Sequence, residues 1–176
     1  MLLVDNGSVF TDDIEECLDN FLVTRLTPNS VDDDLKRYDS FILSGRKSNN
    51  KKTNAVNAAI IRHADSTGKP LFGICYGAEM LALTFGGTIR KMSKVRRGLE
   101  KVTFEQNPLC DTGVQQVFES HRYEIANLGS RLERIGGSET CENEFVHVVG
   151  TKMFGAQFHP EETYGGQKML LKFADT

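Results

Sequence analysis

The sequence is poor in cysteine and proline and has no tryptophan: its 176 residues include four cysteines and four prolines. The cysteines lie far apart and form no C-x-x-C pair, which argues against a zinc site and against a compact disulfide framework. They are Cys17, Cys75, Cys110 and Cys141. We therefore expect free thiols, no bound metal, and a function for one or two cysteines at most.

Long apolar runs and an excess of one charge are also missing. A membrane helix needs roughly 20 apolar residues, and no run approaches that length, so we expect no membrane partner. The formal net charge of −3 gives no basic excess that would neutralise a phosphate backbone, so we expect no nucleic-acid partner. Residues 1–5, MLLVD, contain no basic leader. We therefore expect no signal peptide and a cytoplasmic location.

The length fits a single domain over residues 1–176. A chain of this size buries roughly 70% of the surface that its unfolded form exposes, so its core needs neither disulfides nor a structural metal. No internal repeat, low-complexity tract or Pro/Ser-rich linker indicates a second domain.

In the first half, short apolar runs alternate with helical patterns, which is typical of βα units around a parallel sheet. Strands are expected at 2–4, 22–26, 41–43 and 71–74. Helices are expected at 14–22, 31–37, 55–64 and 78–85, and the polar stretch 46–53 reads as a loop.

After residue 87 the pattern changes to closely spaced extended segments, which look like hairpins or edge strands on the same sheet. They cover 88–91, 99–104, 114–118, 132–135, 145–149 and 153–158, and a terminal helix is expected at 167–173. The sequence thus predicts a single-domain α/β fold with a mostly parallel, open twisted sheet flanked by helices. This is a flavodoxin-like arrangement with extra hairpin strands in the second half.

The segment most informative about function is Gly73-Ile74-Cys75-Tyr76-Gly77, where an apolar strand runs directly into a helix. This G-x-C-x-G pattern matches a nucleophile elbow with cysteine in place of serine. The glycines leave room for strand and helix to approach closely. The helix N-terminus favours the thiolate, and adjacent backbone N–H groups can bind an oxyanion. A lone cysteine is usually a buried small hydrophobe, but the flanking glycines predict a nucleophile here.

A cysteine nucleophile needs a base, and the sequence offers four histidines. His159 is the best candidate because it follows a buried strand and precedes Pro160, which ends strand pairing. Glu161 can reach the ring nitrogen of His159 that does not face the cysteine, giving nucleophile, base and orienting carboxylate. The other three lie in a polar helix end, at a strand end beside a pocket, and in an extended segment: His63, His121 and His147.

Taken together, GICYG at 73–77 and QFHPE at 157–161 resemble the class I, or triad, glutamine amidotransferases. The resemblance extends over nearly the whole chain, including VDNG at 4–7, the strand at 41–45 and the Gly86-Gly87 turn. Within the family, ESH at 119–121 and SETC at 138–141 are most similar to the separate glutaminase subunits of archaeal GMP synthases. The elbow and the HPE segment are shared by relatives that serve anthranilate, carbamoyl phosphate and other synthases.

The resemblance implies that Cys75 attacks the side-chain amide of glutamine, with His159 as base and Glu161 holding the imidazole. It implies an oxyanion hole from the N–H of Tyr76 and from the loop at Gly45 and Arg46, and glutamine binding by a further set of residues. That set is Gly77, Glu79, Ser120 and His121.

The resemblance also implies that ammonia passes to a partner, an ATP-pyrophosphatase-type synthetase that aminates xanthosine monophosphate. ATP and magnesium are expected on that partner, and no cofactor is expected in this chain.

Two positions depart from the usual family pattern. Arg46 stands where the family usually has a glycine, and Glu79 stands where it usually has glutamine. A carboxylate only accepts hydrogen bonds, whereas an amide also donates, and a negative charge near Cys75 opposes thiolate formation. Three alternatives therefore stay open: a pseudo-glutaminase acting as a binding or regulatory module, an amidotransferase subunit of another synthase such as an anthranilate or aminobenzoate type, and a related cysteine hydrolase.

Overall fold

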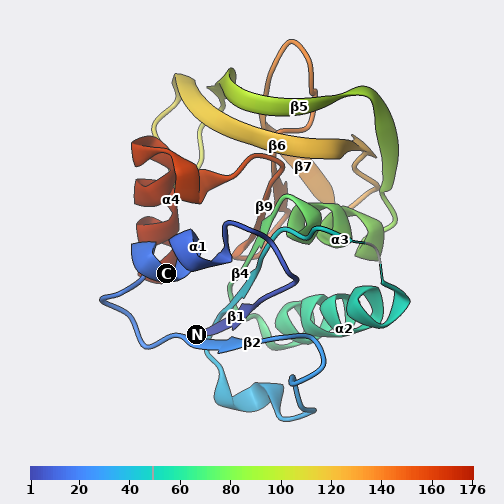
Figure 1. The fold of residues 1–176 in the computed structure, drawn as a ribbon, viewed down its shortest axis with the longest axis vertical. Coiled ribbons are helices and arrows are strands. Elements are labelled where there is room, and N and C mark those ends of the chain that lie inside the picture. Colours follow the sequence, from blue (N-terminus) through green and yellow to red (C-terminus); the bar gives the residue numbers. More distant parts are fainter. Residues whose placement is uncertain (49) are drawn as a thin grey trace.

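A single mixed β-sheet connects the whole molecule (Figure 1). The computed structural model describes residues 1–48 and 50–176, and in these residues the nine strands lie in the order β2-β1-β3-β4-β9-β8-β7-β5-β6. The pairs from β2 to β9 are parallel and those from β9 to β6 are antiparallel. The strands are β1 (Leu2–Val4), β2 (Thr24–Leu26), β3 (Phe41–Leu43), β4 (Leu71–Ile74), β5 (Thr88–Phe104), β6 (Gly113–Asn127), β7 (Leu132–Gly137), β8 (Phe145–Val148) and β9 (Met153–Ala156).

Helices cover both faces of the parallel part because alternate strand residues point to opposite sides. Leu2 and Val4 pack with α2 (Lys51–Thr67) and α3 (Tyr76–Thr84) in one apolar cluster. Leu3, between them, packs with α1 (Thr11–Cys17) and α4 (Tyr164–Ala174) in a second cluster. Short 3-10 turns, η1 (Leu35–Arg37) and η2 (Pro160–Glu162), complete the described elements.

The predicted fold class is confirmed, although the antiparallel half of the sheet is larger than the sequence suggests. Several predicted boundaries were wrong. The stretch 31–37 forms only the turn η1, α1 ends at Cys17 rather than at 22, and α3 begins at Tyr76 rather than at 78. The segments predicted at 88–91 and 99–104 belong to one continuous strand, β5.

The predicted loop 46–53 is shorter than expected, because α2 begins at Lys51. Asn50 caps this helix: its side chain accepts hydrogen bonds from the backbone N–H groups of Lys52 and Thr53. The helix ends at Gly68, whose φ of 67° suits the left-handed C-cap. Residue 49, inside the predicted loop, lies outside the described residues.

The β5–β6 pair forms a long curved ribbon that passes above α3 in Figure 1. Its pairing shifts register between Lys91 and Arg96, an irregularity of the kind that increases strand twist. The backbone of Phe118 on β6 bridges to that of His159, beyond β9. The ribbon therefore carries residues 119–123 to the same end of the sheet as the predicted catalytic segments. Among the helices that the structure describes, none has the length and apolar character needed to cross a bilayer.

We predict that Gly77→Ala destabilises the fold strongly. An added Cβ would lie 2.3 Å from the backbone oxygen of Leu43, so α3 would have to move away from β3. Overpacking of this kind costs about 3 kcal/mol at its upper end, which lowers Tm by roughly 6 to 12 °C in a chain of this size.

Thermal unfolding checks this, with Gly165→Ala as the matched control. A Cβ at Gly165, in α4, meets only the end of the Gln115 side chain at 3.3 Å. We expect Tm of the control to stay constant or rise. Equal Tm values for Gly77→Ala and wild type would contradict the packing argument.

Candidate active site

Three neighbouring strands end at the same edge of the sheet, where ligands bind in parallel α/β sheets. The pairing of Leu43 with Gly73 and of Ile74 with Ala156 aligns the ends of β3, β4 and β9. The residues that follow these strands are those singled out from the sequence. The loop at Gly45 follows β3, Cys75 follows β4, and His159 lies three residues beyond β9.

Cys75 occupies a strained turn between β4 and α3. Its φ is 50° and its ψ is −102°, and among the described residues it is the only one other than glycine with a positive φ. Its backbone N–H donates to the carbonyl of Ala156 at 2.6 Å, which fixes the turn against β9. Strain of this kind costs about 1 to 3 kcal/mol and concentrates at functional sites.

The charge state of Cys75 differs from the sequence-based expectation. The thiol is buried, and burial together with the charges of Glu79, Glu119 and Glu161 raises its pKa well above the ordinary value. The backbone N–H of Tyr76 lowers the pKa but does not prevail. The expectation that the helix N-terminus favours the thiolate was therefore wrong, and the resting sulfur is a thiol that needs a base.

A histidine with its carboxylate is present at the same sheet edge. His159 Nδ1 lies 2.7 Å from Glu161 Oε1, and the two side chains are 3% and 0% exposed. Because the carboxylate accepts, Nδ1 carries the proton and Nε2 is left as the basic nitrogen. The ring packs on Phe10 at a centroid distance of 4.5 Å, and the backbone N–H of His159 donates to Phe118 at 2.8 Å.

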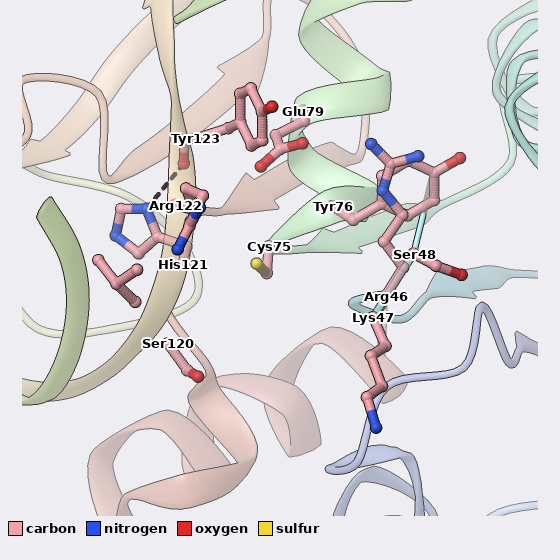
Figure 2. A pocket seen from close by; sticks show the side chains of 11 residues that line it. Arg46, Lys47, Ser48, Cys75, Tyr76, Glu79, Ser120, His121, Arg122 and Tyr123 are labelled. Atoms are coloured by element: carbon pink, nitrogen blue, oxygen red, sulfur yellow. Dashed lines mark hydrogen bonds between the residues drawn. The ribbon is translucent and has the colours of Figure 1, made fainter. Parts of the chain in front are cut away.

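A cavity of about 410 Å³ opens above Cys75 (Figure 2). Of the predicted site residues, six line this cavity: Arg46, Cys75, Tyr76, Glu79, Ser120 and His121. In Figure 2, Arg46 and His121 flank the Cys75 sulfur from opposite sides. His159, Glu161, Gly45 and Gly77 are not among the lining residues.

The two glycines have close packing contacts instead. A Cβ at Gly45 would lie 3.1 Å from His159 Cε1, so this glycine lets the loop after β3 approach the imidazole. Gly77 lies against the backbone of Leu43, as described above. Both therefore position the site from behind its wall.

Arg46 has a role that the sequence did not indicate. Its guanidinium lies 3.9 Å from the centre of the Tyr76 ring and donates to Asn54 at 2.9 Å, and the Tyr76 hydroxyl donates to the same Asn54 oxygen at 2.8 Å. The backbone of Arg46 also bridges to Gly7. The departure at Arg46 thus fixes the tyrosine beside Cys75 in place.

Sequence reasoning missed several lining residues, namely Lys47, Ser48, Val95, Arg122 and Tyr123. Tyr123 could have been found because it lies two and four residues from His121 and Glu119 in one strand, and alternate strand residues share a face. Val95 carried no such signal, since it lies in the stretch of β5 that reads as polar.

Glu79 lies one helical turn from the nucleophile, and its N–H donates to the Cys75 carbonyl at 3.0 Å. It is 5% exposed, and burial raises the pKa of its carboxyl, against the opposing effect of the Arg46 charge. The expected opposition of Glu79 to the Cys75 thiolate is confirmed, because Glu79 is the largest of the charges that raise the pKa of Cys75.

We predict that Glu79→Gln speeds alkylation of Cys75 by iodoacetamide in the absence of substrate. Removing the negative charge removes repulsion of the thiolate, so the pKa of Cys75 falls and the thiolate fraction below that pKa rises. A pKa lowered by about 1 raises the rate about tenfold.

The alkylation rate is followed by mass spectrometry from neutral to alkaline pH. Glu15→Gln, on the exposed face of α1, serves as control and should match wild type. Identical rates for wild type and Glu79→Gln would show that the carboxylate exerts no field on the sulfur.

Chemically, the site combines a buried thiol, an imidazole held by a carboxylate, and backbone N–H groups at the start of α3. This set is suited to acyl transfer through a thioester. A candidate cation site lies next to it, where ligand atoms of Glu119, His121 and Glu144 come within 4.8 Å of one another.

Comparisons with known proteins agree with this geometry. A model of the glutamine amidotransferase class-I family matches residues 2–175. The glutamine-hydrolyzing subunit of GMP synthase from Thermoplasma volcanium is 30% identical over 97% of this chain and 88% of its own. The same subunit from Thermococcus kodakarensis is 28% identical over 99% of this chain and 97% of its own.

A crystal structure described as a GMP synthase subunit of Thermoplasma acidophilum superposes with a TM-score of 0.87 at 24% identity. The match covers 99% of this chain and 91% of that one. At this identity the likeness shows a shared fold.

Proposed function

Because the chain belongs to the class I glutamine amidotransferases, we propose that it is a glutaminase subunit that supplies ammonia to a synthetase, most specifically for the conversion of xanthosine monophosphate to GMP. One observation carries the glutaminase proposal: Cys75 occupies the strained turn at the end of β4, on the sheet edge that also holds the His159–Glu161 pair.

In the proposed reaction the Cys75 sulfur attacks the side-chain amide carbon of glutamine. His159 Nε2 takes the thiol proton and gives it to the departing nitrogen, so ammonia leaves and a γ-glutamyl thioester remains. The negative oxygen of the tetrahedral intermediate accepts from the N–H of Tyr76 and from the loop at Gly45 and Arg46. Water, deprotonated by His159, then cleaves the thioester to glutamate and restores the thiol.

Glutamine binding is proposed for the residues that line the cavity. Glu79 offers a negative charge for the α-ammonium, while Ser120 and His121 offer polar groups on the opposite wall. The raised pKa of Cys75 fits this scheme, since proton transfer to His159 is then needed only when glutamine is in place. A resting thiol also limits side reactions with other electrophiles.

The proposed acceptor rests on the relatives. Those named above are subunits of GMP synthase, and a subunit implies a partner. We propose that the partner binds xanthosine monophosphate, ATP and magnesium, and that this chain contributes no cofactor.

The test begins with capture of the chain's partner from native cell extract and its identification by mass spectrometry. The purified complex then receives amide-15N glutamine, xanthosine monophosphate, ATP and Mg²⁺. We expect 15N in the amino group of GMP. Labelled ammonia without labelled GMP would retain the glutaminase and refute the acceptor. No labelled ammonia would refute the glutaminase itself.

A second candidate is a pseudo-glutaminase that binds or regulates, and the carboxylates around Cys75 are the observation that favours it. Glutamine turnover by Glu79→Gln separates the two. A decayed site should gain tenfold or more, about 1.4 kcal/mol of barrier. In a working site the pocket has adapted to the carboxylate, and turnover should be similar or lower even though alkylation is faster. We expect the second result.

A further inference from the structure

Beside the Cys75 cavity, β6 and the start of β8 bring three metal-ligating side chains together. Glu119 and His121 lie two residues apart on β6, and Glu144 directly precedes β8. Their residues are 2%, 5% and 1% exposed. One ligand atom from each lies within 4.8 Å of the other two. The catalytic scheme above uses neither carboxylate.

These carboxylates are poorly satisfied among the described residues. Neither oxygen of Glu119 has a hydrogen-bond partner, and Glu144 has one for Oε1, which accepts from the Ser138 hydroxyl at 2.8 Å, but none for Oε2. Burial and the charge of Glu119 raise the pKa of Glu144 to about 8. Two buried carboxylates at this separation need a proton or a cation between them.

His121 distinguishes a cation from hydrogen bonding alone. Its Nδ1 lies 2.7 Å from the backbone oxygen of Tyr123, the contact drawn dashed in Figure 2, and a carbonyl only accepts, so Nδ1 carries a proton. Its Nε2 lies 2.8 Å from Glu119 Oε2 but in a geometry that makes no hydrogen bond. The His121 side chain is 1% exposed, so water does not satisfy this nitrogen.

Metal-binding histidines have this arrangement: one ring nitrogen donates to a backbone carbonyl, and the other is thereby aimed at the metal as a lone pair. We propose that Glu119, His121 and Glu144 bind one divalent first-row transition-metal ion. One imidazole and two carboxylates, with no thiolate, form a donor set suited to ions of the Zn²⁺ or Mn²⁺ kind. The hydroxyl of Ser138 orients Glu144 from outside the donor set.

A route for the ion is present. A second cavity of about 170 Å³, lined by residues 95–100 of β5, reaches Glu119, whereas His121 lines the Cys75 cavity. The proposed site thus lies between the two cavities. An ion there would neutralise Glu119, one of the charges that raise the pKa of Cys75. Binding of this ion does not depend on the substrate proposed above.

Nothing in the sequence indicated this site, because its ligands have no recognised spacing. Glu119 and Glu144 are separated by β7 and two turns, and the absence of paired cysteines led us to expect no metal. The competing explanation is a shared proton. The Glu119 contact and the Tyr123 carbonyl raise the pKa of His121 against the effect of burial, which would suit a protonated ring.

The test is metal uptake by the full chain, stripped with chelator and then dialysed against Zn²⁺ or Co²⁺ in excess Mg²⁺. We expect one equivalent to remain after gel filtration, and a Co²⁺ spectrum without a sulfur-to-cobalt charge-transfer band. Cys75→Ser should bind equally well. Glu119→Gln and Glu144→Gln should each weaken binding at least a hundredfold.

His147→Gln is the matched control, since His147 also contacts a glutamate, Glu133, at 2.7 Å, but has both ring nitrogens partnered. It should bind as wild type does. No uptake of either ion would overturn the proposal in favour of the shared proton. Undiminished uptake by both glutamine variants, or a thiolate band in the wild-type Co²⁺ spectrum, would also overturn it. The wild-type spectrum decides even where a variant fails to fold.

Discussion

Cys75→Ala should abolish ammonia release from glutamine while leaving the protein folded. The thiol is the proposed nucleophile, and no thioester forms without it. We expect turnover to fall at least a thousandfold, about 4 kcal/mol of barrier. The change removes only one buried sulfur, so the cavity left behind is small and Tm should fall by a few degrees at most.

The assay measures glutamate from glutamine in the complex with the captured partner. Cys141→Ala is the matched control, because Cys141 is equally buried but lies outside the cavity. It should retain wild-type turnover. The partner's reaction with free ammonium should survive in Cys75→Ala, which shows that the complex is intact. Glutamate release by Cys75→Ala at the wild-type rate would exclude the thioester.

His159→Ala should be almost as damaging, at roughly a thousandfold or more. The pKa of Cys75 is raised by burial and by three carboxylates, so at neutral pH the sulfur is protonated and depends on a base. Without the imidazole, neither the thiol proton nor the proton for the departing ammonia has a carrier.

Glu161→Ala should lose less than His159→Ala, by roughly tenfold or more. The imidazole remains, although it is no longer held in its tautomer. Loss of the Glu161 charge also lowers the pKa of Cys75 and offsets part of the damage. Turnover of both variants is compared with that of His147→Ala, a histidine remote from the cavity. If His121→Ala were more damaging than His159→Ala, the assignment of the base would be wrong.

The strands that hold the catalytic segments could be predicted because each is a short buried apolar run. The strands β1, β3 and β4 begin and end where the sequence indicated. The cysteine turn was recognisable because its two glycines are required by contacts with backbone atoms, which no other residue can make.

The errors have physical causes in longer-range structure. β5 was divided because residues 92–98 are mostly exposed on both faces, so they carry no apolar alternation, and only pairing with β6 makes them a strand. The beginning of α2 was missed because the polar residues 51–54 show no periodicity, and the cap at Asn50 supplies the signal.

The pKa of Cys75 could not be predicted for a related reason. Of the charges that raise it, Glu79 is local, but Glu119 and Glu161 come from β6 and η2. Sequence alone showed the helix N-terminus, which favours a thiolate, without the burial that opposes it more strongly. The cluster of Glu119, His121 and Glu144 is likewise a product of the fold.

The most direct test of the central claim, that Cys75 is the nucleophile for glutamine, is labelling with an electrophilic chloroketone analogue of glutamine followed by peptide mapping. We expect one label, on Cys75, and protection by excess glutamine. Burial raises the pKa of Cys17 to about 11 and also raises that of Cys110, so neither should compete at neutral pH. Labelling of Cys17, Cys110 or Cys141 to the same extent, or labelling of Cys75 that glutamine does not slow, would contradict this claim.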